Sequence, residues 1–154
     1  MSSVLKAISQ ALADSLSACT WSSVADPVTV QRSNWPSFDI EDLVNPVIAI
    51  TPPGYVVERL ARTAHQYDYQ VCLFLGRHTP ATADADAMLD LLEEVEGTIR
   101  DHAWSTLAPG VTWPTGLSSP QEIAVEMNPD EALQDRNVWR AVITVTYRVP
   151  RAHA

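Results

Sequence analysis

The stretch Val138-Trp-Arg-Ala-Val-Ile-Thr-Val-Thr-Tyr-Arg-Val149 alternates between two sets of side chains. One set is entirely apolar and consists of Trp139, Ala141, Ile143, Val145, Tyr147 and Val149. The other set holds both arginines and both threonines of the stretch. A period of two predicts a β-strand with one face on a core and the other toward water or a partner. At about 3.3 Å per residue it would span about 40 Å, so we expect it to lie in a sheet onto which helices pack.

Length and composition predict one globular domain over residues 1–154, because 46% of the residues are apolar and 19% are charged. The net charge of −9 argues against an electrostatic grip on nucleic acid, which needs Lys and Arg to displace counterions. No apolar run approaches the roughly 20 residues of a membrane span, and no signal peptide is visible, so no membrane partner is expected. Cys19 and Cys72 are too few for a disulfide framework and are expected to be free thiols.

Two helices are predicted from apolar residues that recur every three or four positions. The first is capped by Ser2 or Ser3, ends near Ala18, and places these residues on one face: Val4, Leu5, Ile8, Ala11, Leu12 and Leu16. The second covers about residues 84–104, with an apolar stripe made of Met88, Leu91, Leu92, Val95, Ile99 and Ala103. We expect this longer helix to cover the sheet face that carries Ile143 and Val145.

The remaining strands are short or paired in a hairpin. Strands are expected over residues 28–32, 46–51 and 121–127, and Pro52-Pro53-Gly54 is expected to end the second of them. Tyr55–Thr63 and Gln66–Gly76 are predicted to form an extended β-hairpin with a rather polar first strand and a turn near Ala64-His65. Residues 151–154 are expected to be a loose tail.

Together these segments predict an α+β fold. We expect a mixed or antiparallel sheet of about five to six strands, with the N-terminal helix and the helix near 84–104 packed on one face. The extended β-hairpin is an addition to this sheet.

No catalytic or metal-binding motif is present in the sequence. Asp39, Glu41 and Asp42 form an acidic cluster without a neighbouring His or a glycine-containing loop, so we interpret it as a solvated turn. The histidines, which are His65, His78, His102 and His153, do not stand at a zinc-binding spacing. A glycine-rich phosphate loop and a Gly-x-Ser-x-Gly elbow are both absent. We therefore predict no enzyme activity, no metal and no cofactor.

The five tryptophans are many for a chain of this length, and two of them lie in proline-containing stretches. Trp35 precedes Pro36, and Trp113 precedes Pro114. Each could clamp a loop onto the core. Alternatively, Trp35 and Trp113 are aromatic anchors in a protein–protein interface, where such residues are enriched.

The order of the elements and six short segments carry a resemblance. The segments are Phe38-Asp-Ile-Glu-Asp-Leu43, Val47-Ile-Ala-Ile-Thr-Pro52, Gln66-Tyr-Asp-Tyr-Gln-Val71, Leu91-Leu-Glu-Glu-Val95, the N-terminal helix and Ile143-Thr-Val-Thr-Tyr-Arg148. Over nearly the whole chain, this pattern resembles the tail terminator (tail completion) proteins of tailed bacteriophages, which belong to the neck and head–tail joining proteins. The resemblance rests on strand and helix patterns, not on catalytic signatures.

The resemblance implies a structural protein of the virion tail or neck, assembled in the host cytoplasm. Such proteins form hexameric rings that cap the tail tube and end its polymerisation. The implied partners are copies of the chain itself, the tail tube protein, the head-closure (stopper) protein of the neck and, in a contractile tail, the sheath. DNA would pass through the lumen without specific binding, and an acidic protein suits that passage because it repels phosphate.

The hairpin is the natural contact element for such a ring, through strand addition or side-chain packing between neighbours. We single out Arg59, Arg62 and Tyr67 as interface candidates; the alternative is an ordinary exposed hairpin. Three other functions stay open: a head-closure (stopper) or other neck connector protein, a tail tube or baseplate subunit, and an enzymatic or small-ligand-binding α+β domain. An adaptor is disfavoured because it would contain more helix.

Overall fold

A computed structural model of the chain describes residues 3–34, 43–79, 82–101, 120–127 and 137–152. The elements, in chain order, are α1 (Val4–Ser17), β1 (Thr29–Arg32), β2 (Val47–Ala61), β3 (Ala64–His78), α2 (Thr82–Asp101), β4 (Glu122–Met127) and β5 (Val138–Ala152). The five strands form one sheet in the order β1-β2-β3-β5-β4. β1 is parallel to β2, and the other neighbours are antiparallel. The predicted α+β class with a mixed sheet is confirmed.

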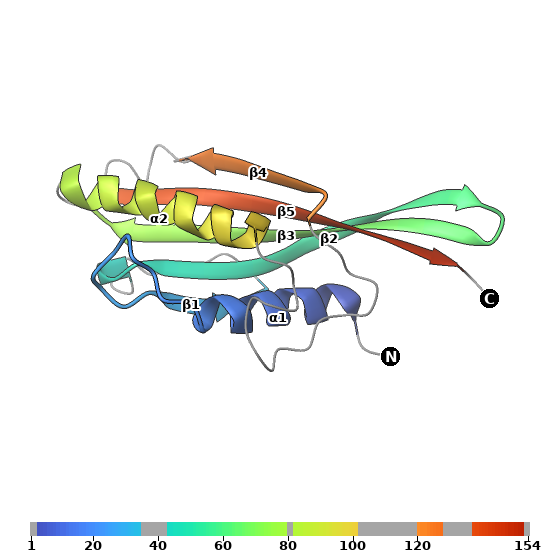
Figure 1. Cartoon of the computed structure of the whole chain (residues 1–154), viewed down its shortest axis with the longest axis horizontal. Helices are drawn as coiled ribbons and strands as arrows, with labels where there is room; N and C mark the ends of the chain where they lie inside the picture. Colours follow the sequence, from blue (N-terminus) through green and yellow to red (C-terminus); the bar gives the residue numbers. More distant parts are fainter. Residues whose placement is uncertain (1–2, 35–42, 80–81, 102–119, 128–136, 153–154) are drawn as a thin grey trace.

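Both helices pack on one face of the sheet (Figure 1) and share a single hydrophobic core with it. The fully buried side chains of this core include Ile8, Leu12 and Leu16 from α1, Met88, Leu91, Val95 and Ile99 from α2, and Ile48, Ile50, Val71, Leu73 and Leu75 from the sheet. The helix residues in this list are among those whose spacing predicted two amphipathic helices. The N-cap of α1 is Ser3, whose side chain accepts a hydrogen bond from the Lys6 N–H at 3.3 Å.

The alternation of β5 places its apolar set on the core side, as predicted. Every member from Trp139 to Val149 is at most 5% exposed. In the register with β3, Ile143 lies opposite Leu73 and Val145 opposite Val71, so the two strands present one continuous apolar face to α2. The expectation of a loose C-terminal tail was wrong for residues 151–152, because β5 continues to Ala152 and pairs there with Ala64, whereas residues 153–154 lie outside the described residues.

Pro52-Pro53-Gly54 does not end a strand, contrary to the expectation from sequence. β2 runs through it from Val47 to Ala61, so the predicted second strand and the first strand of the hairpin are one element. Thr51 pairs with Cys72 and Gly54 with Gln70, which leaves the two prolines opposite a single residue of β3. This is a β-bulge. β1 ends opposite Ile50, so the prolines also lie on an edge, where a missing N–H breaks no ladder bond.

The hairpin turn lies two residues earlier than expected. Ala61 pairs with Ala64, so the turn consists of Arg62 and Thr63, whereas Ala64 and His65 already belong to β3. The antiparallel pairing itself agrees with the prediction. The sequence lacked a turn signature such as Asn-Gly, which explains the error in its position.

Glu94 of α2 fixes the segment that leaves α1. Its carboxylate accepts hydrogen bonds from the backbone N–H groups of Ser22 at 2.9 Å and Ser23 at 3.0 Å, and from both serine hydroxyls. Burial alone would raise the pKa of Glu94, but these four hydrogen bonds outweigh it and lower the pKa below the ordinary value. The ionised carboxylate is therefore the form that holds the segment after α1 against α2.

We predict that Leu73→Ala lowers the free energy of unfolding by about 2–5 kcal/mol, because it leaves a cavity in the middle of the core. Leu73 is fully buried between Ile50 of β2 and Ile143 of β5. Urea denaturation measures the change. Leu60→Ala is the control, because Leu60 is 52% exposed and its truncation should cost less than about 0.5 kcal/mol. Equal losses in the two variants would contradict this core.

We predict that Glu94→Gln lowers the free energy of unfolding by about 1 kcal/mol at pH 7, because charge-assisted hydrogen bonds are lost. A carboxyl whose pKa is lowered by folding stabilises above its unfolded pKa, and that contribution is lost as pH falls through the folded pKa. The difference between variant and wild type should therefore shrink toward pH 3 in thermal melts. Glu93→Gln is the matched control; a difference independent of pH would refute the role of the charge.

Candidate interface on a projecting arm

The sheet extends beyond the helices as a three-stranded ribbon. This ribbon, called the arm below, consists of residues 54–70 from β2, its turn and β3, and residues 146–152 from β5. Figure 1 shows it reaching past α1, α2 and β4 at one end of the molecule. β1 ends opposite Ile50, and β4 begins opposite Thr146. Among the described residues, the arm therefore has two outer edges without a pairing strand, which are templates for strand addition.

A tyrosine cluster joins the arm to the core. The rings of Tyr67 and Tyr69 stack with their centroids 5.8 Å apart, and Tyr55 lies 5.5 Å from Tyr69 and 6.2 Å from Tyr67. Tyr69 and its cross-strand neighbour Tyr147 are 4% and 1% exposed. Burial raises the pKa of the Tyr147 hydroxyl well above its ordinary value. Tyr67, which was predicted to be an interface residue, is half-buried in this cluster, so one of its roles is to stiffen the base of the arm.

The opposite face of the arm carries an ion pair between β3 and β5. Arg148 of β5 lies directly across from Asp68 of β3 and donates two hydrogen bonds to its carboxylate, at 3.0 Å and 3.3 Å. These bonds raise the pKa of the Arg148 guanidinium, and the nearby Glu58 adds to the effect. The pair is exposed to solvent and is screened, so it orients the two strands more than it stabilises the fold.

The outer strand of the arm exposes large apolar side chains. Tyr55, Val56, Val57 and Leu60 are between 44% and 60% exposed, and they are the main exposed hydrophobic residues of the described chain apart from Val44, Val125 and Met127. A rather polar strand was predicted here from the sequence, and these exposed side chains were not identified. The uninterrupted run Tyr55-Val56-Val57 was the available signal, since apolar residues on both faces of a strand need two covering layers.

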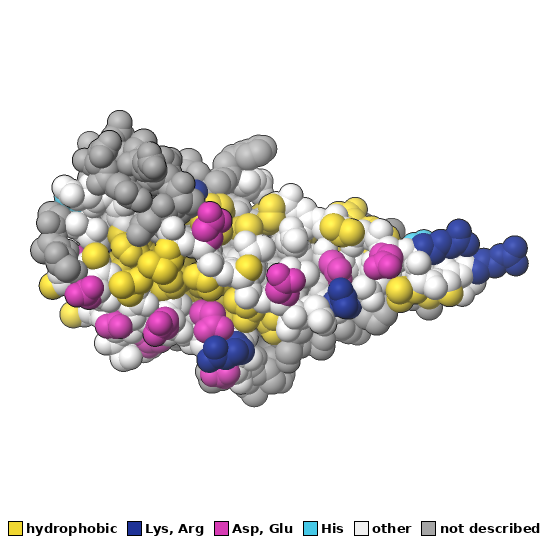
Figure 2. Space-filling view, turned by 90° about the horizontal axis from the view of Figure 1, so that it is seen from above, with side chains coloured by type: hydrophobic (Ala, Val, Ile, Leu, Met, Phe, Trp, Pro, Cys, Tyr) yellow, Lys and Arg dark blue, Asp and Glu magenta, His cyan; other side chains and the backbone are white. Residues whose placement is uncertain are grey.

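The tip of the arm is basic. Arg62 lies in the turn and Arg59 lies in β2 three residues before it, and both side chains are exposed. Arg59 donates through Nε to the carbonyl of Ala61 at 3.3 Å. Figure 2 shows dark-blue Lys and Arg side chains at this end without magenta ones beside them, whereas the other positive side chains of this face lie nearer to acidic ones along the rest of the molecule. The fold thus brings together two of the predicted interface residues. Trp35, Trp113 and the acidic cluster at 39–42 lie outside the described residues, and the interface prediction for the two tryptophans stays a prediction.

The described part of the chain was also inspected for metal ligands and for reactive thiols. It contains no group of three or more His, Cys, Asp or Glu residues placed to hold a metal ion. Both cysteines are free, as predicted. Burial, with a smaller effect of Glu94, raises the pKa of the Cys19 thiol, which favours the unreactive protonated form. No helix in the described ranges is long and apolar enough to cross a bilayer.

Comparisons with protein-family models and with curated proteins return no match to this chain. Function is therefore inferred from the arm and from the fold that projects it.

Proposed function

We propose that this protein is a structural component of a tailed phage, of the tail terminator kind. In this proposal, copies of the chain form a closed ring, with six as the expected number. The ring caps the tail tube, ends its polymerisation and offers a docking face to the head-closure protein of the neck. The observation that carries the proposal is the projecting arm with its exposed apolar strand and open edges.

Exposed apolar side chains on the arm favour assembly. Tyr55, Val56, Val57 and Leu60 lie in the arm portion of β2, which no described element covers. Packing such side chains against a neighbour removes apolar surface from water, which is the main driving force of association. The outer edges of the arm add backbone groups that a neighbouring strand can pair with.

The shape of the molecule favours head-to-tail contacts. The arm is at one end and the helices cover the other (Figure 1), so the two ends present different surfaces. A contact between two different surfaces repeats from copy to copy. It closes into a ring when the rotation per copy fits and otherwise grows into a filament. A terminator needs the closed ring, whereas a tail tube subunit, which is the rival proposal, needs continued growth.

The charge of the protein fits a DNA-conducting ring. A net charge of −9 gives a surface that repels phosphate, so DNA could pass a lumen of this protein without being retained. The proposed partners are the last ring of the tail tube on one side, the head-closure protein on the other and, in a contractile tail, the sheath. A head-closure (stopper) role for the ring itself is the nearest alternative.

We predict that the purified protein, alone or with tail tubes, forms closed rings with a central hole. Light scattering coupled to size exclusion measures the mass, and negative-stain microscopy shows the shape. Tubes incubated with the protein should gain capped ends and stop growing. Long tubes formed by the protein alone would replace the terminator proposal by a tail tube subunit. A monomer that leaves tube ends unchanged would contradict every ring-forming role.

We predict that Val56→Thr combined with Leu60→Thr weakens assembly by about tenfold or more while leaving the fold intact. Both side chains are more than half exposed, and Thr keeps the strand propensity, so the thermal unfolding temperature should hardly change. The loss arises because two apolar groups no longer leave water on association. Val44→Thr is the control, since Val44 is 69% exposed but lies outside the arm. Assembly of the arm variant at the wild-type concentration would exclude the arm as the contact.

A further inference from the structure

The outer face of α2 carries uncompensated negative charge. The helix has seven carboxylates and one arginine. Arg100 contacts Glu96 at 3.0 Å and Asp101 at 2.9 Å, and Glu94 is occupied by the two serines. Four carboxylates remain, of which Asp84 is half-buried in the first turn of the helix. The other three, Asp86, Asp90 and Glu93, are called the acidic stripe below. All three are exposed, and none of them takes part in the ion pairs found among the described residues.

The acidic stripe points away from the core. Its members are spaced by four and three residues, which places them on one side of a helix. The opposite side of α2 buries Met88, Leu91, Leu92, Val95 and Ile99. Like charges at this spacing repel one another and destabilise the helix slightly. A positively charged surface laid along the stripe would remove that repulsion.

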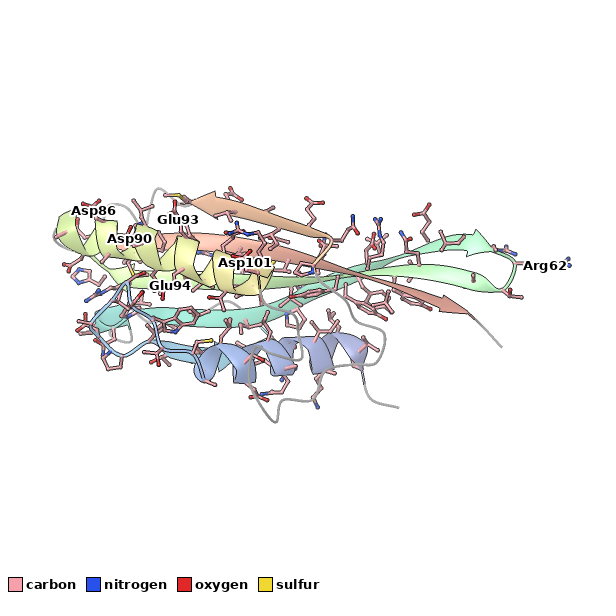
Figure 3. All side chains as sticks on the ribbon, in the orientation of Figure 1. Arg62, Asp86, Asp90, Glu93, Glu94 and Asp101 are labelled. Atoms are coloured by element: carbon pink, nitrogen blue, oxygen red, sulfur yellow. The ribbon has the colours of Figure 1, made fainter. Side chains whose placement is uncertain are left out.

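The arm tip is the complementary surface on the described chain. Arg59 and Arg62 are exposed, whereas Arg148, farther down the arm, is already paired with Asp68. Guanidinium groups bind carboxylates through two parallel hydrogen bonds, which fix orientation as well as charge. Figure 3 shows Arg62 at one end of the molecule and Asp86, Asp90 and Glu93 toward the other. A tip therefore cannot reach the stripe of its own chain, and only a second copy can satisfy both surfaces.

We propose that the arm of each copy docks with Arg59 and Arg62 on the acidic stripe of α2 in the next copy. The inference rests on the proposed ring and adds the surface of the neighbour that receives the arm. Each copy gives one tip and accepts one tip, so the same contact repeats around the ring. The apolar side chains next to the tip are buried by the same contact. The charges determine how the arm is oriented on the neighbour and which surface it binds.

Charge reversal on each side separately, followed by mixing, tests this contact. The tip variant is Arg59→Glu with Arg62→Glu, and the stripe variant is Asp86→Lys with Asp90→Lys and Glu93→Lys. Each alone places like charges in the contact and should weaken assembly by at least about tenfold. An equimolar mixture should assemble again, because the tip of each variant then meets an opposite charge on the stripe of the other. Glu122→Lys with Glu126→Lys, two exposed positions on β4, is the control and should assemble like the wild type.

The readouts are mass by light scattering for every protein and mixture, and circular dichroism to verify that each variant folds. Wild-type assemblies should also weaken between 0.1 and 1 M salt, because the screening length falls from about 10 Å to about 3 Å. Single variants that assemble normally would overturn the tip-to-stripe contact and leave the ring proposal standing. Loss without recovery on mixing would also overturn it. Recovery in assemblies that are not rings would support the contact and refute the ring, and a wild type that never self-associates would refute both.

Discussion

The pairing of β3 with β5 is the constraint on which the rest of the structure depends. The two strands have 15 residues each and stay in one antiparallel register from His78 opposite Val138 to Ala64 opposite Ala152. One end of this ladder is covered by the helices and forms the centre of the core. The other end extends past the helices and forms the middle of the arm. Core and arm are therefore parts of the same two strands, and the core sets the direction of the arm.

Two local features lie where the long strands pass from the core into the arm. The tyrosine cluster of Tyr55, Tyr67 and Tyr69 continues the apolar face past the last turn of the helices and stiffens the base of the arm. The bulge at Pro52 and Pro53 bends β2 where β1 stops. Beyond these features no described layer covers β2, so its apolar side chains meet water in the isolated chain. In our proposal, a neighbouring copy of the chain covers these side chains.

Sequence predicted what depends on local periodicity. The alternation of β5 and the stripes of α1 and α2 identified most of the core, because burial follows the period of each element. The predictions from sequence were wrong for features that depend on which strands pair. The sequence of Pro52 and Pro53 predicted the end of a strand, but β2 accommodates them because they lie at a sheet edge and in a β-bulge. The edge and the bulge depend on where β1 ends, which the sequence does not indicate. The extension of β5 to Ala152 depends on β3, and the exposure of Val56 depends on the absence of a covering layer. Arg59 and Arg62 were predicted from the sequence as interface candidates, and this stays a prediction. The acidic stripe, which we propose as their counterpart, was not among the candidates.

A cryo-electron-microscopy reconstruction of the assembled protein tests the central claim most directly, because it locates the arm relative to its neighbours. We expect a single closed ring of copies related by rotation, with each arm lying on the body of the next copy. A reconstruction in which the arms project into solvent, or in which copies pair about a twofold axis without using them, would contradict a ring held together by the arms.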